Sequence, residues 1–119
     1  MNMNVQELVL FGFGAVALGG VVVAVRLFAR GSVPLWLRNA HGLAGLAALV
    51  ALFATNLLGE ASTPTRAWWA FGLLLAGFTG GMVLLRVLFQ PRPPSWVVLL
   101  HAAIGMAGIA LLYGALFKI

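Results

Sequence analysis

Two histidines, His41 and His101, are the side chains of this sequence best suited to chemistry. Each lies in a long apolar stretch, about seven residues after its start, which in a helix corresponds to a depth of roughly 10 Å. An ionisable ring at that depth normally faces the interior of a helix bundle and marks a functional site, because exposing it to lipid is costly. The pair therefore predicts a metal or cofactor site. The alternative is a hydrogen-bonded structural pair.

Small residues follow each histidine at helical spacing. The positions four residues on are Gly45 and Gly105, and the positions seven residues on are Ala48 and Gly108. Residues at these spacings share a helix face. A groove of small residues lets two helices pack closely in a membrane. It would equally admit a flat macrocycle standing edge-on between the helices.

Two arginines recur in the same way. Arg26 and Arg86 continue a stripe of small residues on the first and third apolar stretches, close to the connection that follows each stretch. Because arginine pairs with carboxylates in a fork-like geometry, both could meet the carboxylates of a cofactor bound near the histidines. The alternative is that both snorkel at a helix end and help to fix the topology.

Four long apolar blocks carry these residues, and 63% of the chain is hydrophobic. The blocks cover about residues 8–29, 35–58, 67–89 and 96–117. A helix needs about 20 apolar residues to cross the roughly 30 Å hydrocarbon layer of a bilayer, so each block is long enough. The sequence predicts an all-α integral membrane protein, a single domain over residues 1–119 with four transmembrane helices.

The sequence repeats itself at an offset of 60 residues, over about 8–58 and 67–117. The matches include Arg, Pro, Trp and His, which seldom coincide by chance in apolar sequences. Matching pairs are Phe11 and Phe71, Gly20 and Gly80, Arg26 and Arg86, Pro34 and Pro94, Trp36 and Trp96, and His41 and His101. A repeat of two helices enters the membrane twice in the same direction. We therefore expect a tandem duplicated hairpin with pseudo-twofold symmetry along the membrane normal.

The charge of the chain, +5 in total, is concentrated at one end of this bundle. Five arginines lie around the first and third connections, namely Arg26, Arg30, Arg38, Arg86 and Arg92. Because basic loops stay in the cytoplasm, we expect both termini outside, in a prokaryotic inner membrane. This topology explains the basic balance without nucleic acid. The first block, which no Lys or Arg precedes, is expected to be a span and not a cleaved signal peptide.

Imidazoles approaching one body from both sides of a small-residue groove describe a six-coordinate haem b (protohaem IX) between the second and fourth helices. In this placement of His, Gly and Arg, over residues 11–112, the chain resembles the small integral membrane b-type cytochromes. The resemblance implies electron transfer with a quinone or a partner redox protein. Many such cytochromes stack two haems on four histidines, whereas two histidines allow one bis-His haem at most.

Other function classes stay open. Each histidine could hold the magnesium of a separate (bacterio)chlorophyll, in a pigment-binding or structural subunit of a larger membrane complex or oligomer. Small multidrug exporters also have four helices, but they rely on a membrane-embedded acidic residue, and Glu7 lies near a helix end. The chain has no Asp, no Cys and no phosphate, dinucleotide or zinc motif, so no catalytic constellation of side chains is expected. Any redox activity would belong to a cofactor.

Overall fold

The structure, a computed structural model, describes residues 3–119 and is built from four long helices. They are α1 (Val5–Arg30), α2 (Leu35–Leu58), α3 (Thr65–Gly80) with its π-helical continuation η2 (Gly81–Leu88), and α4 (Ser95–Phe117); a short 3-10 turn, η1 (Glu60–Ser62), follows α2. The described residues contain no strand. All four helices, α3 counted together with η2, are long and apolar enough to cross a membrane, which confirms the predicted all-helical membrane class.

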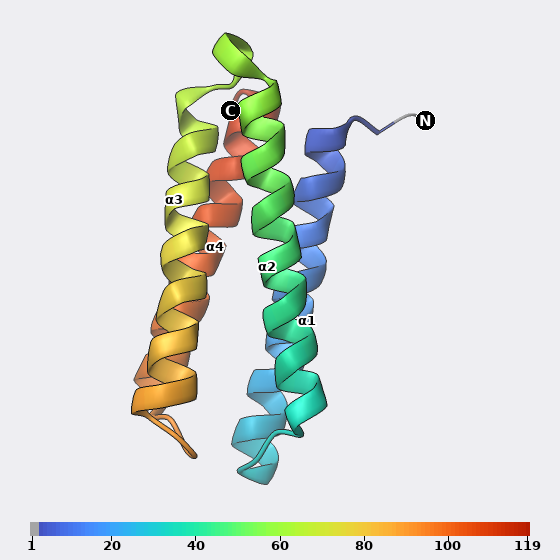
Figure 1. Ribbon diagram of the computed structural model, residues 1–119. Coiled ribbons are helices and arrows are strands. Elements are labelled where there is room, and N and C mark those ends of the chain that lie inside the picture. Colours follow the sequence, from blue (N-terminus) through green and yellow to red (C-terminus); the bar gives the residue numbers. More distant parts are fainter. Residues whose placement is uncertain (1–2) are drawn as a thin grey trace.

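The helices form an elongated bundle of 45 × 27 × 22 Å in which each packs against two neighbours. α1 and α3 each contact both α2 and α4, so α2 and α4 lie diagonally across the bundle. In Figure 1, α2 and α3 lie in front of α1 and α4, and the two hairpin connections share the end opposite the N- and C-termini. The two histidine-bearing helices can therefore face each other only through the bundle centre.

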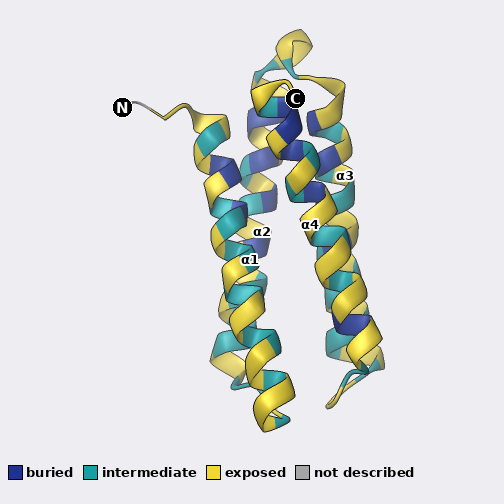
Figure 2. Cartoon of the chain, turned by 180° about the vertical axis from the view of Figure 1, so that it is seen from behind, coloured by how far each residue is buried: buried dark blue, intermediate teal, exposed yellow. Residues whose placement is uncertain are grey.

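The best-packed part of the bundle is the half nearer the termini, where most of the buried residues gather (Figure 2). This cluster consists of Val9, Leu10, Phe13, Leu49, Leu52, Ala70, Leu74 and Leu112. His41 and His101 come before the α2 and α4 members of this cluster, so they lie on its loop side. Many large apolar side chains on the outer surface are exposed, as a lipid environment requires.

The helix ends use local sequence signals. α1 begins with a capping box, in which Asn4 accepts a hydrogen bond from the Glu7 N–H and the Glu7 carboxylate accepts one from the Asn4 N–H. It ends at Gly31, whose φ of 73° is readily adopted only by glycine. Pro34 and Pro94 cap α2 and α4 and fix where both helices begin.

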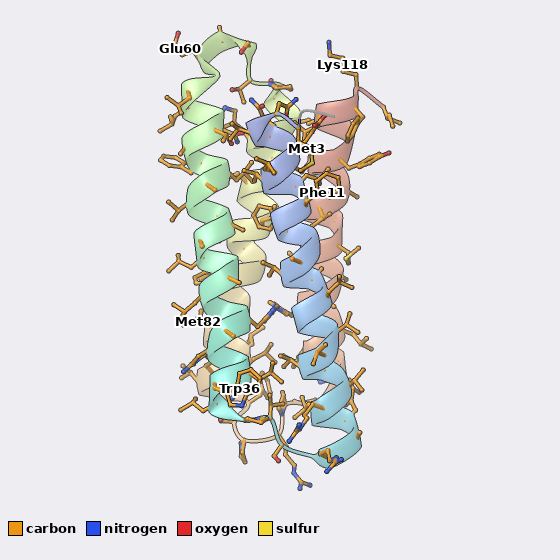
Figure 3. All side chains as sticks on the ribbon, turned by 90° about the vertical axis from the view of Figure 1, so that its right-hand side faces the viewer. Met3, Phe11, Trp36, Glu60, Met82 and Lys118 are labelled. Carbon is orange, nitrogen blue, oxygen red and sulfur yellow. The ribbon has the colours of Figure 1, made fainter. Side chains whose placement is uncertain are left out.

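The two ends of the bundle differ in character. Trp36 lies at the loop end, opposite Glu60 and Lys118 (Figure 3). Indole is favoured at a membrane–water interface, so the position of Trp36 fits the level at which α2 would enter the hydrocarbon layer. The only acidic residues of the chain, Glu7 and Glu60, both lie at the terminal end. The loop end is therefore basic without compensation by any acidic side chain.

Candidate functional site

The two histidines meet in the interior of the bundle. The ring centroids of His41, from α2, and His101, from α4, lie 6.3 Å apart, and the ring planes are nearly perpendicular at 84°. Both side chains are partly buried. Among residues 3–119 no hydrogen bond joins the two imidazoles. The pair is therefore close enough to share one ligand but is not held together by a bond of its own.

His101 is oriented by its own hairpin. Its Nδ1 donates a hydrogen bond of 2.9 Å to the carbonyl oxygen of Gly77 in α3. Because a carbonyl can only accept, Nδ1 carries the proton, and the neutral ring keeps its lone pair on Nε2. A histidine that binds a metal is commonly held in this way, with the second ring nitrogen donating to a backbone carbonyl.

His41 is held differently. Its Nδ1 is buried and makes no hydrogen bond of good geometry in the part of the chain that the structure describes, although the backbone of Val16 lies close to the ring. A buried polar nitrogen without a partner costs free energy, so such an atom in a native protein calls for an explanation. A metal bound at Nδ1 itself is one explanation, because coordination would give this nitrogen the partner that it lacks.

A glycine lies against each imidazole. A Cβ added to Gly20 of α1 would come within 2.9 Å of His41 Cε1, and one added to Gly81 of η2 would come within 2.7 Å of His101 Cε1. Real Cβ atoms do not pack that closely, so a side chain at either position would force the imidazole beside it to move. The 60-residue offset in the sequence pairs Gly20 with Gly80, so it does not identify Gly81. Both halves do contain two adjacent glycines, and this was the signal that could have pointed to Gly81.

Two of the predicted groove residues, Gly45 and Gly105, stay near the histidines. Gly45 is buried, and a Cβ there would meet Val16 and Phe78 at ordinary contact distances of 3.7 and 3.8 Å. A Cβ on Gly105 would meet no described atom within 4 Å. The space one turn below the histidines is therefore open beside α4 and bounded by Phe78 beside α2.

The other two predicted groove residues belong to helix packing. A Cβ on Gly108 would lie 2.6 Å from Leu74 Cγ, so this glycine lets α4 pack closely against α3. Ala48 is partly buried and packs on the apolar cluster near the termini. Close helix packing, the alternative reading of the groove, accounts for both positions.

The two repeated arginines have different surroundings. Arg86 of η2 reaches across to α2, where its Nη1 donates to Asn39 Oδ1 and its Nη2 donates to the Arg38 carbonyl oxygen, both at 3.0 Å. Arg26 is exposed and makes no hydrogen bond within the described residues. Only Arg86 therefore lies between the two hairpins, and its contacts with Asn39 and Arg38 could not be read from the repeat.

The donor set limits the kind of metal site. No cluster of three or more His, Cys, Asp or Glu side chains occurs among residues 3–119, so a metal at His41 and His101 must bring its other ligands with it. A macrocycle does so. Because a metal–imidazole bond is about 2 Å long, two imidazoles on opposite sides of one metal have ring centres roughly 6 Å apart. The observed centroid separation of 6.3 Å fits that spacing.

Comparisons of the chain with protein-family models, with curated proteins and with solved structures found no match. Its function is therefore inferred from the site alone, namely the two imidazoles, the glycines against them and the basic loop end of the bundle.

Proposed function

We propose that the chain is a membrane b-type cytochrome or haem-binding subunit, with one haem b held between His41 and His101. The observation that carries this proposal is the 6.3 Å separation of the two ring centroids, on helices that face each other through the bundle centre. When bound, haem b supplies one-electron chemistry that the protein tunes through axial ligands, hydrogen bonds and burial. The electron partner would be a quinone or another redox protein, as the resemblance to b-type cytochromes implies.

Under this proposal, the histidines hold the metal and the glycines beside them position the imidazole rings. His101 offers Nε2 to the metal, while its Nδ1–H bond to the Gly77 carbonyl fixes the ring orientation. His41 offers the second imidazole. Gly20 and Gly81 let the backbones of the neighbouring helices lie against the rings and restrict their movement. The haem carboxylates would face the basic loop end, where no acidic side chain competes for the arginines.

We further infer a duplicated hairpin, with a pseudo-twofold axis along the membrane normal. Its support is the offset of 60 residues in the sequence and the equal depth of the histidines, each the seventh residue of a helix capped by proline. The basic loop end is proposed to lie in the cytoplasm of a prokaryote, with both termini outside.

The pigment alternative has less support from the geometry. Two separate (bacterio)chlorophylls need each imidazole to face a macrocycle of its own. Rings only 6.3 Å apart in the interior leave little room for two such groups between them. The structural alternative, a hydrogen-bonded histidine pair, also lacks support, because no such bond joins the imidazoles in residues 3–119.

The test is an absorption spectrum of the purified protein, oxidised and dithionite-reduced, after expression with an ample haem supply. We expect a red-shifted Soret band and a sharp alpha band, both lost in His41→Ala and in His101→Ala. Gly12→Ala is the matched control, because its Cβ would meet no described atom within 4 Å. A colourless wild type refutes haem binding, and far-red absorption supports chlorophyll. A spectrum that depends on one histidine alone contradicts the bis-His site.

A further inference from the structure

The face formed by α2 and α3 joins a polar cluster to an apolar groove. The polar cluster, at the loop end, consists of Arg38, Asn39 and Arg86. The Arg86 guanidinium donates one hydrogen bond to the Asn39 side chain and one to the backbone carbonyl of Arg38. The groove lies deeper in the membrane and has a volume of about 280 Å³. Only Leu, Val and Phe side chains line it, within 46–53 of α2 and 71–78 of α3. This face is turned toward the viewer in Figure 1.

The polar cluster contains two guanidinium groups and no acidic side chain. Both carboxylate side chains of the sequence, Glu7 and Glu60, lie at the other end of the bundle. Arginine recognises phosphate through paired N–H donors and is less strongly hydrated than lysine. The cluster therefore has positive charge that no acidic side chain balances and that an anionic ligand would neutralise.

The apolar groove lies at the depth of an acyl chain. Residues 46–53 follow Arg38 by 8 to 15 positions, which places them roughly 12–22 Å further along α2. The hydrocarbon layer of one leaflet is about 15 Å thick, half of the bilayer core. A lipid whose phosphate lies at the polar cluster would thus bring the lower part of one chain into the groove.

We propose that the face of α2 and α3 binds one anionic phospholipid, with its phosphate at Arg38 and Arg86 and an acyl chain in the groove. Basic sites between membrane helices on the cytoplasmic side recognise lipid headgroups in this manner. The charge supplies the preference for an acidic headgroup, and the groove supplies affinity that does not depend on the headgroup. This site needs no haem, and it assigns Arg86 to the lipid phosphate and not to a haem carboxylate.

The experiment is a native mass spectrometry titration of the full chain with phosphatidylglycerol and with phosphatidylcholine of the same acyl chains. Both lipids contain the phosphate, but the choline cation leaves phosphatidylcholine without net charge. Because each arginine near the membrane surface adds to the attraction of an anionic lipid, we expect wild type to prefer phosphatidylglycerol about tenfold or more. Arg38→Gln and Arg86→Gln should reduce that preference several-fold. Arg26→Gln is the matched control, because it removes the same charge at the same end from an exposed residue.

A groove variant separates the two parts of the site. Val50→Trp places a large side chain in the groove. It should weaken the binding of both lipids equally and leave the preference for phosphatidylglycerol unchanged. Arg86→Lys keeps the charge but not the fork geometry of the guanidinium. Its preference for phosphatidylglycerol should therefore lie between those of wild type and Arg86→Gln.

Several outcomes would overturn the proposal. They are equal affinity of wild type for the two lipids, an equal loss of the preference for phosphatidylglycerol in Arg26→Gln and Arg86→Gln, and unchanged affinity for both lipids in Val50→Trp. A further one is a change of the haem spectrum in Arg86→Gln with no change in lipid binding, since it would assign Arg86 to a haem carboxylate.

Discussion

The two hairpins place equivalent histidines at the same depth but hold them in different ways. In the second hairpin, His101 donates to the carbonyl of Gly77. In the first, His41 Nδ1 has no partner among residues 3–119, and its ring is restrained by packing against Gly20. Residues that match at the 60-residue offset therefore do not have matching environments. The second hairpin orients its imidazole through a backbone carbonyl, whereas the first holds its imidazole by packing.

The origin of this difference lies in the helices that precede the histidine helices. α1 is an ordinary α-helix to Arg30, whereas α3 continues as a π-helix from Gly81. The wider turn of a π-helix changes which residues face the interior, and such segments are frequent at functional sites. Gly81 and not Gly80 then meets His101, and Arg86 reaches α2 while Arg26 is exposed.

The largest expected effect tests the π-helical register. Gly81→Ala would place a Cβ 2.7 Å from His101 Cε1 and 3.0 Å from its Nδ1, and should disturb the bond to Gly77. Overpacking of this kind costs about 1–3 kcal/mol. The free energy of unfolding in detergent, followed by circular dichroism, measures it.

The neighbouring residue provides the control for this test. A Cβ on Gly80 would meet no described atom within 4 Å, so Gly80→Ala should be neutral or stabilising by up to about 1 kcal/mol through helix propensity. Equal effects of Gly80→Ala and Gly81→Ala would show that the π-helical register is wrong.

The general fold could be predicted from the sequence because it depends on composition and length. Four apolar blocks separated by short connections can form little else in a membrane, and the observed helices begin and end within about three residues of the predicted blocks. The positions of His41 and His101 in the helices also follow from sequence, because Pro34 and Pro94 fix where α2 and α4 begin.

The details around the histidines could not be predicted, for a physical reason. A shift of one residue within a helix leaves the composition and the apolar pattern almost unchanged. The adjacent glycines Gly80 and Gly81 were a signal, but the sequence could not decide which of them would contact His101. The contact of Arg86 with Asn39 depends on how the hairpins pack, and Leu99, which corresponds to Asn39 in the repeat, offers no such acceptor. Symmetry therefore predicted two equivalent arginines, and the structure contains two different ones.

The second prediction tests that difference between the arginines. Arg86→Gln removes the hydrogen bonds to Asn39 and to the Arg38 backbone, which join the two hairpins. Hydrogen bonds between membrane helices contribute about 0.6 kcal/mol on average and about 1.7 at most, so the loss of both should cost about 1 kcal/mol. Arg26→Gln should stay within about 0.5 kcal/mol of wild type.

A double-mutant cycle checks that this cost comes from the named contact. Asn39→Ala combined with Arg86→Gln should cost less than the sum of the single changes, because either one breaks the bond between them. Additive costs, measured by unfolding of the four proteins in the same detergent, would mean that the contact between the hairpins contributes nothing.

The smallest expected effect is the difference in stability between His41→Leu and His101→Leu, in protein produced without haem. His101→Leu removes the bond to Gly77 and should cost about 0.6 kcal/mol, the average for such bonds in membranes. His41→Leu removes a buried nitrogen that has no partner among residues 3–119, so it should be neutral or stabilising. With haem supplied, the proposed function predicts that both variants lack the stabilisation that haem binding would give to wild type. Equal costs in the haem-free protein would contradict the asymmetry, because they would mean that both rings are held alike before any ligand binds.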